Sequence, residues 1–300
     1  MESFDNFNKK EKECFNQDLT QKEEQNSVFI MNLLMKEKCS MPNKETMTEI
    51  IKRYLGDVEC FCYEENVSGF SLNDHKVEFK DGPFPAQLMI TGCMDRIQID
   101  EFTKSQMWDC QEERDRILKE CKYQVIATDM LSKGMDYKER ADMLMDYMEA
   151  LLEIYPECEA IVFQNSGKMF TAIQIREHKI QREKRFIYFA VNVRFFNIQG
   201  TNDMIVDTLG MSILDLPDLQ YHFHDMDPNW VVNHAYNLLC YIYDNNDPIE
   251  SGETVAGISE GNMDVDIYWK CNYEDSLIQP VRLVLDICMN DYASGKRDYK

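Results

Sequence analysis

The sequence contains no apolar run of the roughly 18 residues that a membrane-spanning helix needs. Its first 26 residues also lack the apolar stretch of a secretory signal and consist largely of polar and charged residues. We therefore expect residues 1–26 to form a flexible polar tail. We also expect the protein to remain in the cytoplasm, without a membrane partner.

The common catalytic and nucleotide-binding motifs are also missing. No GxSxG, HExxH or GxGxxG occurs. The stretch 164–168 (QNSGK) ends in Gly-Lys, but it lacks the upstream glycine and the following Ser or Thr of a phosphate-binding loop, so a hairpin turn is favoured. Cys240 and His234 are six residues apart on an expected helix and point to opposite faces. The motifs therefore identify no catalytic residue.

Patterns that form disulfides or metal sites are absent as well. The eleven cysteines are odd in number and scattered, and no CxxC pair occurs. Several lie inside apolar runs such as LLCYIY, which is typical of buried thiols in a reducing compartment. Cys60 and Cys62 have no second pair or nearby histidine that would complete a zinc site. We expect no cofactor, with a divalent metal at the histidines described below as the alternative.

Positive charge is scarce in one part of the chain. The whole sequence carries a formal charge of −22, and residues 201–291 hold 17 acidic residues against only Lys270 and Arg282. Such a field repels nucleic acid and anionic lipid and favours basic proteins or metal cations. We therefore expect no nucleic-acid partner. Solubility alone is the other explanation of the acidity.

The first half of the sequence predicts alternating strands and helices. We expect strands at 28–35, 58–63, 87–91 and 123–129, a helix capped by Asn43 that ends at Gly56, and a second helix over 104–121. This order of strand, helix, two strands, helix and strand is that of a ferredoxin-like split βαβ unit. We assign it to residues 27–130.

A second unit of sheet and helix is expected over 131–291, followed by a tail at 292–300. Apolar residues recur every three or four positions over 135–155, which predicts a helix that begins with a capping box at Asp136 and Glu139. Further strands are expected at 160–164, 169–175, 186–198, 219–224, 264–273 and 281–288, with a helix over 228–243. The predicted fold class is α+β with largely antiparallel sheets.

Several stretches resemble a bacterial family called domain of unknown function 4261. They are NVRFF (192–196), DTLGM (207–211), the long segment from LPDLQYHFHD to YDNND (216–247), SGETV (251–255) and EDSLIQPVRLVLDI (274–287). The resemblance extends over roughly 125–290, and it implies no activity because the family has none assigned. A looser pattern is similar to suppressor-of-fused-like domains, some bacterial members of which are immunity proteins encoded beside toxins.

Two histidines on one expected strand are the best candidates for metal ligands. In 219–224 the apolar residues alternate with Gln220, His222 and His224, so both histidines share one face. With Asp225 and Asp227 just beyond, they could bind a divalent metal. The alternative is that both hydrogen-bond to neighbouring carboxylates, while Asp227 caps the helix that begins at Pro228.

Arg194 and Arg282 are lone cations on apolar strands in an acidic region. A buried arginine normally pairs with a carboxylate, so we expect structural ion pairs with acidic residues of 207–227 or 264–275. A clamp for a substrate carboxylate is the alternative.

These observations favour a non-enzymatic acidic binding protein, of the kind represented by immunity or inhibitor proteins that neutralise a basic protein partner. The alternatives are a metal-dependent or hydrolytic enzyme that uses His222 and His224, and a structural or regulatory module. The sequence does not indicate the oligomeric state. The candidate binding residues are Asp207, Asp215, Asp218, Asp225, Asp227, Trp230, Asp244, Asp247 and Glu250.

Overall fold

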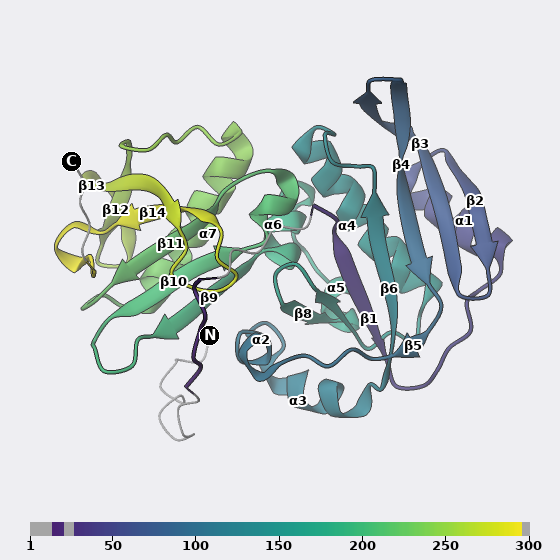
Figure 1. Cartoon of the computed structure of the whole chain (residues 1–300), viewed down its shortest axis with the longest axis horizontal. Coiled ribbons are helices and arrows are strands. Elements are labelled where there is room, and N and C mark those ends of the chain that lie inside the picture. The colour runs from purple at the N-terminus through teal and green to yellow at the C-terminus, as the bar shows by residue number, and fades with distance from the viewer. Residues whose placement is uncertain (1–13, 21–26, 296–300) are drawn as a thin grey trace.

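Two largely antiparallel sheets lie next to each other along the long axis of the molecule (Figure 1). The structure is a computed structural model that describes residues 14–20 and 27–295. The predicted α+β class with antiparallel sheets is confirmed. No helix among these residues is both long enough and apolar enough to cross a bilayer.

The first sheet has the strand order β2-β3-β4-β6-β1-β7-β8, and β5 pairs with β6. All of its pairs are antiparallel. Its strands are β1 (Ile30–Met35), β2 (Val58–Glu64), β3 (Val67–Phe79), β4 (Gly82–Thr91), β5 (Met94–Asp95), β6 (Tyr123–Met130), β7 (Ala160–Phe163) and β8 (Lys168–Thr171). The helices between these strands are α1 (Lys44–Leu55), α2 (Glu101–Ser105), α3 (Gln111–Glu120) and α4 (Tyr137–Ile154).

The strand connections differ from those of a ferredoxin-like unit, in which each helix joins two parallel strands. β1 and β2, on either side of α1, do run in the same direction, but β4 and β6, on either side of α2 and α3, pair antiparallel. β1 pairs antiparallel with β6 on one edge and β7 on the other. Five of the six residues of β1 are buried, so this strand needs a neighbour on both edges. As a result β7 and β8 belong to the first sheet, and α4 connects β6 to β7 within the same unit. This sheet therefore continues past the expected boundary at 130 to Thr171.

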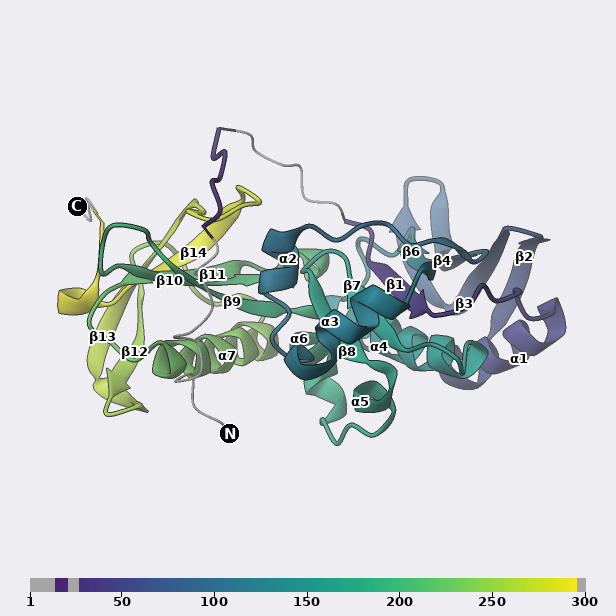
Figure 2. The same ribbon diagram turned by 90° about the horizontal axis from the view of Figure 1, so that it is seen from below.

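The second sheet has the strand order β12-β13-β14-β11-β10-β9, in which only β11 and β14 pair in parallel. The strands are β9 (Asn192–Asn197), β10 (Met204–Leu209), β11 (Asp218–Phe223), β12 (Thr254–Ser259), β13 (Asn262–Asp275) and β14 (Leu283–Cys288). Helix α7 (Pro228–Asn245) lies along one face of this sheet (Figure 2). The short helices η3 (Met211–Leu214) and η4 (Asn290–Tyr292) complete the unit.

The prediction of a long strand over 186–198 is wrong for its first half. The chain forms η2 (Arg182–Lys184) and α6 (Arg185–Ala190) before β9 begins. Arg185 is buried, and its guanidinium donates to Asp146 at 2.7 Å and to Glu149 at 2.6 Å, both on α4. These ion pairs and the burial of Phe186 and Phe189 favour a helical turn over continued strand.

Three other elements also differ from the expectation. The helix over 104–121 is two helices, α2 and α3, separated at 106–110. The strand over 169–175 ends at Thr171, which caps α5 (Ala172–Arg176) through a capping box with Gln174. β3 and β4 form a hairpin that extends far beyond the predicted strand at 87–91.

The expected N-caps are present, but the predicted capping box at α4 is incomplete, and the Glu139 carboxylate lies 2.9 Å from His75 Nδ1 instead. The side chain of Asn43 accepts from Thr46 N at the start of α1, and Asp136 accepts from Lys138 N and Glu139 N at the start of α4. Asp227 caps α7, with Pro228 in its first turn. Each cap satisfies main-chain donors that the helix itself leaves unpaired.

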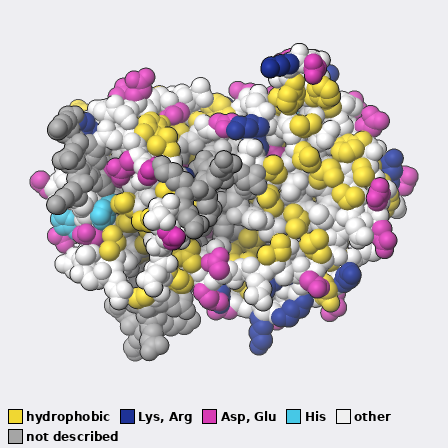
Figure 3. Space-filling view, in the orientation of Figure 1, with side chains coloured by type: hydrophobic (Ala, Val, Ile, Leu, Met, Phe, Trp, Pro, Cys, Tyr) yellow, Lys and Arg dark blue, Asp and Glu magenta, His cyan; other side chains and the backbone are white. Residues whose placement is uncertain are grey.

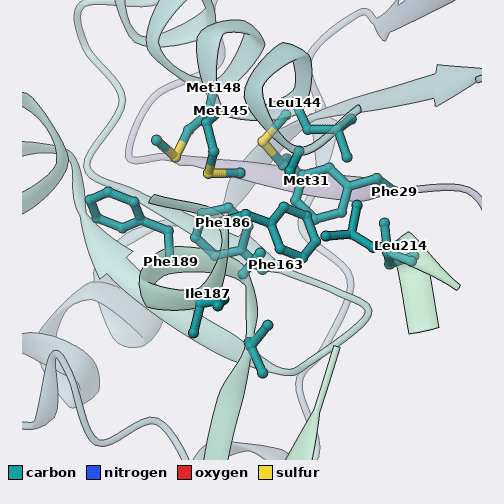
Figure 4. Packing of buried hydrophobic residues seen from close by; sticks show 14 of the residues in the cluster. Phe29, Met31, Leu144, Met145, Met148, Phe163, Phe186, Ile187, Phe189 and Leu214 are labelled. Atoms are coloured by element: carbon teal, nitrogen blue, oxygen red, sulfur yellow. The ribbon is translucent and has the colours of Figure 1, made fainter. Parts of the chain in front are cut away.

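One continuous apolar core runs through both sheets and includes residues from Phe29 to Met289. At its centre, Met145 and Met148 of α4 face Phe163 of β7 and Phe186 of α6 (Figure 4). Phe29 lies between these rings, with its ring centroid 6.0 Å from that of Phe163 and 5.9 Å from that of Phe186. The two sheets therefore share their interior.

Parts of the expected tails are held against the body. Gln17 Oε1 accepts from Gln279 N at 2.7 Å, and Gln279 Nε2 donates to Asp18 O at 2.6 Å. Near the other end, Ala293 bridges to Phe223 of β11. Residues 14–20 and 292–295 are thus not free tails. The other residues of the two predicted tails, 1–13, 21–26 and 296–300, lie outside the described residues.

Candidate functional site

Four charged side chains form a buried cluster in the second sheet. Arg194 of β9 donates from Nε to Asp207 Oδ1 at 2.8 Å and from Nη2 to Oδ2 of the same carboxylate. Arg282 donates from Nη2 to Asp207 Oδ2 at 3.0 Å and from Nε to Asp218 Oδ2 at 3.2 Å. Each of the four side chains is at most 4% exposed.

Main-chain groups satisfy the rest of this cluster. Arg282 also donates to the carbonyls of Thr208 and Pro280, and Arg194 to that of Gln279. Asp218 accepts from Thr208 Oγ1 and from Met211 N. Burial raises the pKa of the Asp218 carboxyl, and the adjacent Arg282 opposes that shift. Because both guanidinium groups are engaged in this way, the cluster acts as structural ion pairs and offers no clamp for a substrate carboxylate.

The buried cluster contradicts part of the expected acidic binding surface. Asp207 and Asp218 were candidates for contact with a basic partner, but both are buried and neutralised by arginine. The partners of Arg194 and Arg282 lie within 207–227, one of the two segments in which the sequence placed them. Buried carboxylates that already have partners cannot contribute to an exposed charge.

His222 and His224 face different neighbours in the described part of the chain. Among the described residues, no group of three or more His, Cys, Asp or Glu side chains could hold a metal ion. His222 is 9% exposed, with its Nε2 3.5 Å from Asp203 Oδ2, whereas His224 Nδ1 lies 3.0 Å from Ser294 Oγ. The expected alternation is also modified, since all six residues of β11 are buried. His224 is thus within hydrogen-bond distance of a serine rather than of the expected carboxylate, and His222 lies beside the carboxylate of Asp203 at ion-pair distance.

His234 is a satisfied core histidine. Its Nε2 lies 2.8 Å from Ala256 O, and its Nδ1 lies 2.9 Å from the hydroxyl of Tyr221. A donor is needed at Nε2 and an acceptor at Nδ1, so the neutral ring meets both contacts. Burial lowers the pKa of His234 below its ordinary value, in agreement with a neutral ring.

The start of α7 brings three of the candidate binding residues together. Asp227 caps the helix, accepting from Asn229 N at 2.9 Å, and Asp225 is exposed with a positive φ of 54°. Trp230 is 37% exposed. The turn between β12 and β13 packs on this ring, because a Cβ at Gly261 would lie 2.8 Å from Trp230 Nε1.

The remaining candidates lie elsewhere. Asp244 lies in the last turn of α7, about 20 Å from Trp230 along the helix axis, and Asp247 and Glu250 follow the end of this helix. Asp247 accepts from the hydroxyl of Tyr273. Asp215 lies 3.7 Å from Lys133, in the first half of the chain. On the face shown in Figure 3, acidic side chains are spread over both halves and do not form a single face.

The β12–β13 hairpin adds residues that the sequence analysis missed. Met263, Val265 and Tyr268 are 54%, 72% and 62% exposed, and Glu260 and Asp266 beside them are also exposed. We call the exposed side chains at the start of α7 and on this hairpin the hairpin patch; they are Asp225, Asp227, Trp230, Glu260, Met263, Val265, Asp266 and Tyr268. Apolar residues interspersed with acidic ones over 263–268 (MDVDIY) were the signal in the sequence. Both kinds are exposed here, where the register between β12 and β13 shifts and interrupts the regular alternation.

A cavity of about 700 Å³ lies between the part of the chain that forms the first sheet, here called the first half, and the part that forms the second sheet, the second half. Phe102, Gln106 and Asn165 line it from the first half, and Arg194 and Gln279 line it from the second. Phe102 stacks on Phe196 at 5.5 Å and meets Phe15 edge-on at 5.5 Å, so residues 14–17 lie along the cavity. Because these residues come from distant parts of the chain, no local pattern in the sequence indicates the cavity.

Residues 207–288 match a family described as a domain of unknown function (DUF4261). The match begins in β10 and ends with β14, so it covers the second sheet except for β9. This confirms the family resemblance seen in the sequence for that part of the chain. No curated protein and no solved structure matches the chain.

Proposed function

We propose that the chain is a non-enzymatic binding protein that recognises a basic protein in the bacterial cytoplasm, as an immunity or inhibitor protein would. The looser resemblance to immunity-type domains and the acidic C-terminal part support this proposal. The recognition site in this proposal is the hairpin patch rather than a whole acidic face.

The hairpin patch carries the proposal because it combines exposed apolar side chains with unopposed negative charge. Residues 225–268 contain nine acidic residues and no lysine or arginine. Val265 and Tyr268, at 72% and 62% exposed, are unusually accessible for their type. An apolar centre with a charged rim is the usual composition of a protein interface.

The two kinds of residue have different tasks in this proposal. Trp230, Met263, Val265 and Tyr268 would lose water on contact and supply affinity. Glu260 and Asp266 would steer a basic partner towards the patch and exclude acidic proteins. Asp244, Asp247 and Glu250, at the other end of α7, contribute little at the patch, because salt screens exposed charges beyond a Debye length of about 8 Å at physiological salt.

A capture experiment tests this proposal. The immobilised chain is exposed to native bacterial extract at low salt, and bound proteins are eluted with rising salt and identified. We expect a partner with a pI above about 9 whose affinity falls as salt rises. In purified form it should bind the Glu260→Gln/Asp266→Asn variant about tenfold more weakly or worse.

The matched control is Glu45→Gln/Glu49→Gln, which removes the same charge from exposed positions of α1 in the other half. It should bind as the unmodified chain does. A Val265→Ser change should weaken binding without altering its salt dependence. An acidic partner, binding that is indifferent to salt, or equal losses in both charge variants would refute the proposal.

A further inference from the structure

A second cavity, of about 270 Å³, lies against the first sheet and adjoins the cavity between the halves. Asp100, Thr103, Gln164 and Gly167 line both cavities. The inner cavity is lined further by the apolar side chains of Leu34, Ile97, Ile99 and Val162, and by the amides of Asn32 and Gln124. It is far in sequence from the hairpin patch, and nothing in the proposed function depends on it.

Asn32 and Gln124 each present one buried polar atom to this cavity. Asn32 is 9% exposed and Gln124 is 1% exposed. Asn32 Nδ2 donates to Gln164 Oε1 at 3.3 Å, and Gln124 Oε1 accepts from Ile97 N at 3.3 Å. Asn32 Oδ1 and Gln124 Nε2 have no hydrogen-bond partner within the described part of the chain. One acceptor and one donor are therefore open.

The strand register places these two residues beside each other. β1 and β6 pair so that Asn32 lies opposite Ile126 and Leu34 opposite Gln124. Asn32 and Gln124 are therefore diagonal neighbours on the same face of the sheet, about 7–8 Å apart. A planar group that lies between them can meet the acceptor on one side and the donor on the other.

The charges around the cavity define the ligand further. Asp100 is the only charged residue among the described residues that line the inner cavity, and its carboxylate already accepts from Thr103 N at 2.8 Å and Thr103 Oγ1 at 2.9 Å. The open atoms are neutral, so an ionic ligand would gain no counter-charge here. Leaving two buried polar atoms without partners is costly, and a matched neutral ligand would recover that cost.

We propose that the inner cavity binds a small neutral molecule that carries an N–H next to a C=O, namely a carboxamide or a lactam. The ligand N–H donates to Asn32 Oδ1, and the ligand carbonyl accepts from Gln124 Nε2. Leu34, Ile97, Ile99 and Val162 enclose its apolar part. A cavity of this size suits a molecule with one ring or a short chain.

Titration of the full chain with small probes tests this inference. N-methylacetamide represents an open-chain amide, uracil a ring lactam, and N,N-dimethylacetamide an amide without the N–H. The side-chain amide signals of Asn32 and Gln124 in ¹H–¹⁵N spectra, identified from the Asn32→Leu and Gln124→Leu variants, report binding. We expect saturable shifts with N-methylacetamide, uracil or both, and binding of N,N-dimethylacetamide about tenfold weaker or worse. Which of the first two binds tighter distinguishes an open-chain source from a ring source.

The variants supply the second measurement. Gln124→Leu and Gln124→Glu should each weaken probe binding about tenfold or more, since both remove the donor. Gln87→Leu is the matched control, because Gln87 lies on neighbouring β4 and lines neither cavity; it should bind as the unmodified chain does. If neither N–H probe binds, if N,N-dimethylacetamide binds equally well, or if the Gln124 variants match the control, the inference is wrong. The probe comparison on the unmodified chain stands even where a variant fails to fold.

Discussion

Part of the acidic charge of the C-terminal segment is buried and neutralised. The buried cluster of Arg194, Asp207, Asp218 and Arg282 shows this. Asp207 pairs with both arginines and Asp218 pairs with Arg282, so the cluster carries no net charge. Removing four charged groups from water is costly, and only the near-complete hydrogen bonding around them offsets that cost. The cluster fixes how β9, β10, β11 and the segment before β14 meet, which is a structural task rather than a catalytic one.

Replacement of Arg282 by methionine should destabilise the fold strongly. The variant Arg282→Met leaves Asp218 without its arginine and Asp207 with only Arg194, so two buried carboxylates lose compensation. We expect the free energy of unfolding to fall by about 3–5 kcal/mol. Urea unfolding followed by circular dichroism measures it. The double variant Arg282→Met/Asp218→Asn should recover part of the loss, and a loss below about 1 kcal/mol in the single variant would contradict a buried ion pair.

His234 should make the fold sensitive to mild acid. Burial holds the pKa of His234 below that of an unfolded histidine, which is about 6.5. The unfolded chain therefore takes up a proton first, so the stability that His234 contributes is present above pH 6.5 and is lost as the pH falls below it. The slope is at most about 1.4 kcal/mol per pH unit.

Comparison of unfolding free energies between about pH 7 and about pH 5 checks this, with His234→Gln as the variant. The variant should be less stable at neutral pH but lose less stability on acidification. Asn233→Gln, at an exposed position of the same helix, is the control, because it removes no titratable group and should keep the slope of the unmodified chain. Parallel curves for the chain and the His234 variant would contradict the assignment.

Elements with strong local signals were predictable from the sequence. α1, α4 and α7 begin at the expected caps because Asn43, Asp136 and Asp227 act on donors within their own first turn. α6 was not predictable, because FIYFAV has strand propensity and its helix depends on ion pairs between Arg185 and the distant α4. The long β3–β4 hairpin was missed because its outer part is polar and exposed, with little apolar alternation.

A side chain at Gly261, in the β12–β13 turn, should lower the stability of the fold. A Cβ there would meet the ring of Trp230 at 2.8 Å, and the backbone has a φ of +80°. Gly261→Ala should lower the free energy of unfolding by about 2–3 kcal/mol and shift Trp230 fluorescence, because the turn must move off the ring.

Gly252→Ala is the matched control for this change. Gly252 also has a positive φ, of +95°, but nothing lies within 4 Å of the position that a Cβ would take there, so only backbone strain remains. It should cost about 1 kcal/mol and leave the fluorescence unchanged. Equal effects of the two substitutions would show that the turn does not rest on Trp230, and would weaken the case for a preformed hairpin patch.

At the scale of the molecule, the sequence indicated two sheets but not how they share strands. β7 and β8 look local to the second half, yet β7 pairs with β1, because that buried strand has two edges to cover, and β8 extends the sheet from β7. Both cavities arise from the same arrangement, since residues of 97–106 and 164–167 line them together with distant strands. Sites of this kind depend on topology, which short-range patterns do not specify.

Lys168 joins the two halves at the centre of the molecule. This residue of β8 is fully buried, and its Nζ donates to Tyr188 O at 2.6 Å, to Val191 O at 3.0 Å and to the hydroxyl of Tyr236 on α7 at 3.3 Å. Asp109 lies 3.6 Å from it. The side chain therefore holds together the end of the first sheet, the turn into β9 and the helix of the second sheet.

With Lys168 and the shared core between them, the two sheets should unfold as one unit. Hydrogen exchange in β1 and β6 should report the same opening free energy as in β10 and β11, and urea transitions by circular dichroism and tryptophan fluorescence should coincide. Lys168→Met should lower that free energy in both sheets by about 2–4 kcal/mol, because three acceptors lose their donor in a buried site. Lys179→Met, at an exposed position, is the control and should change little. Separate transitions, or a loss confined to one sheet, would mean that the family-matching half folds independently and that the cavities form only on docking.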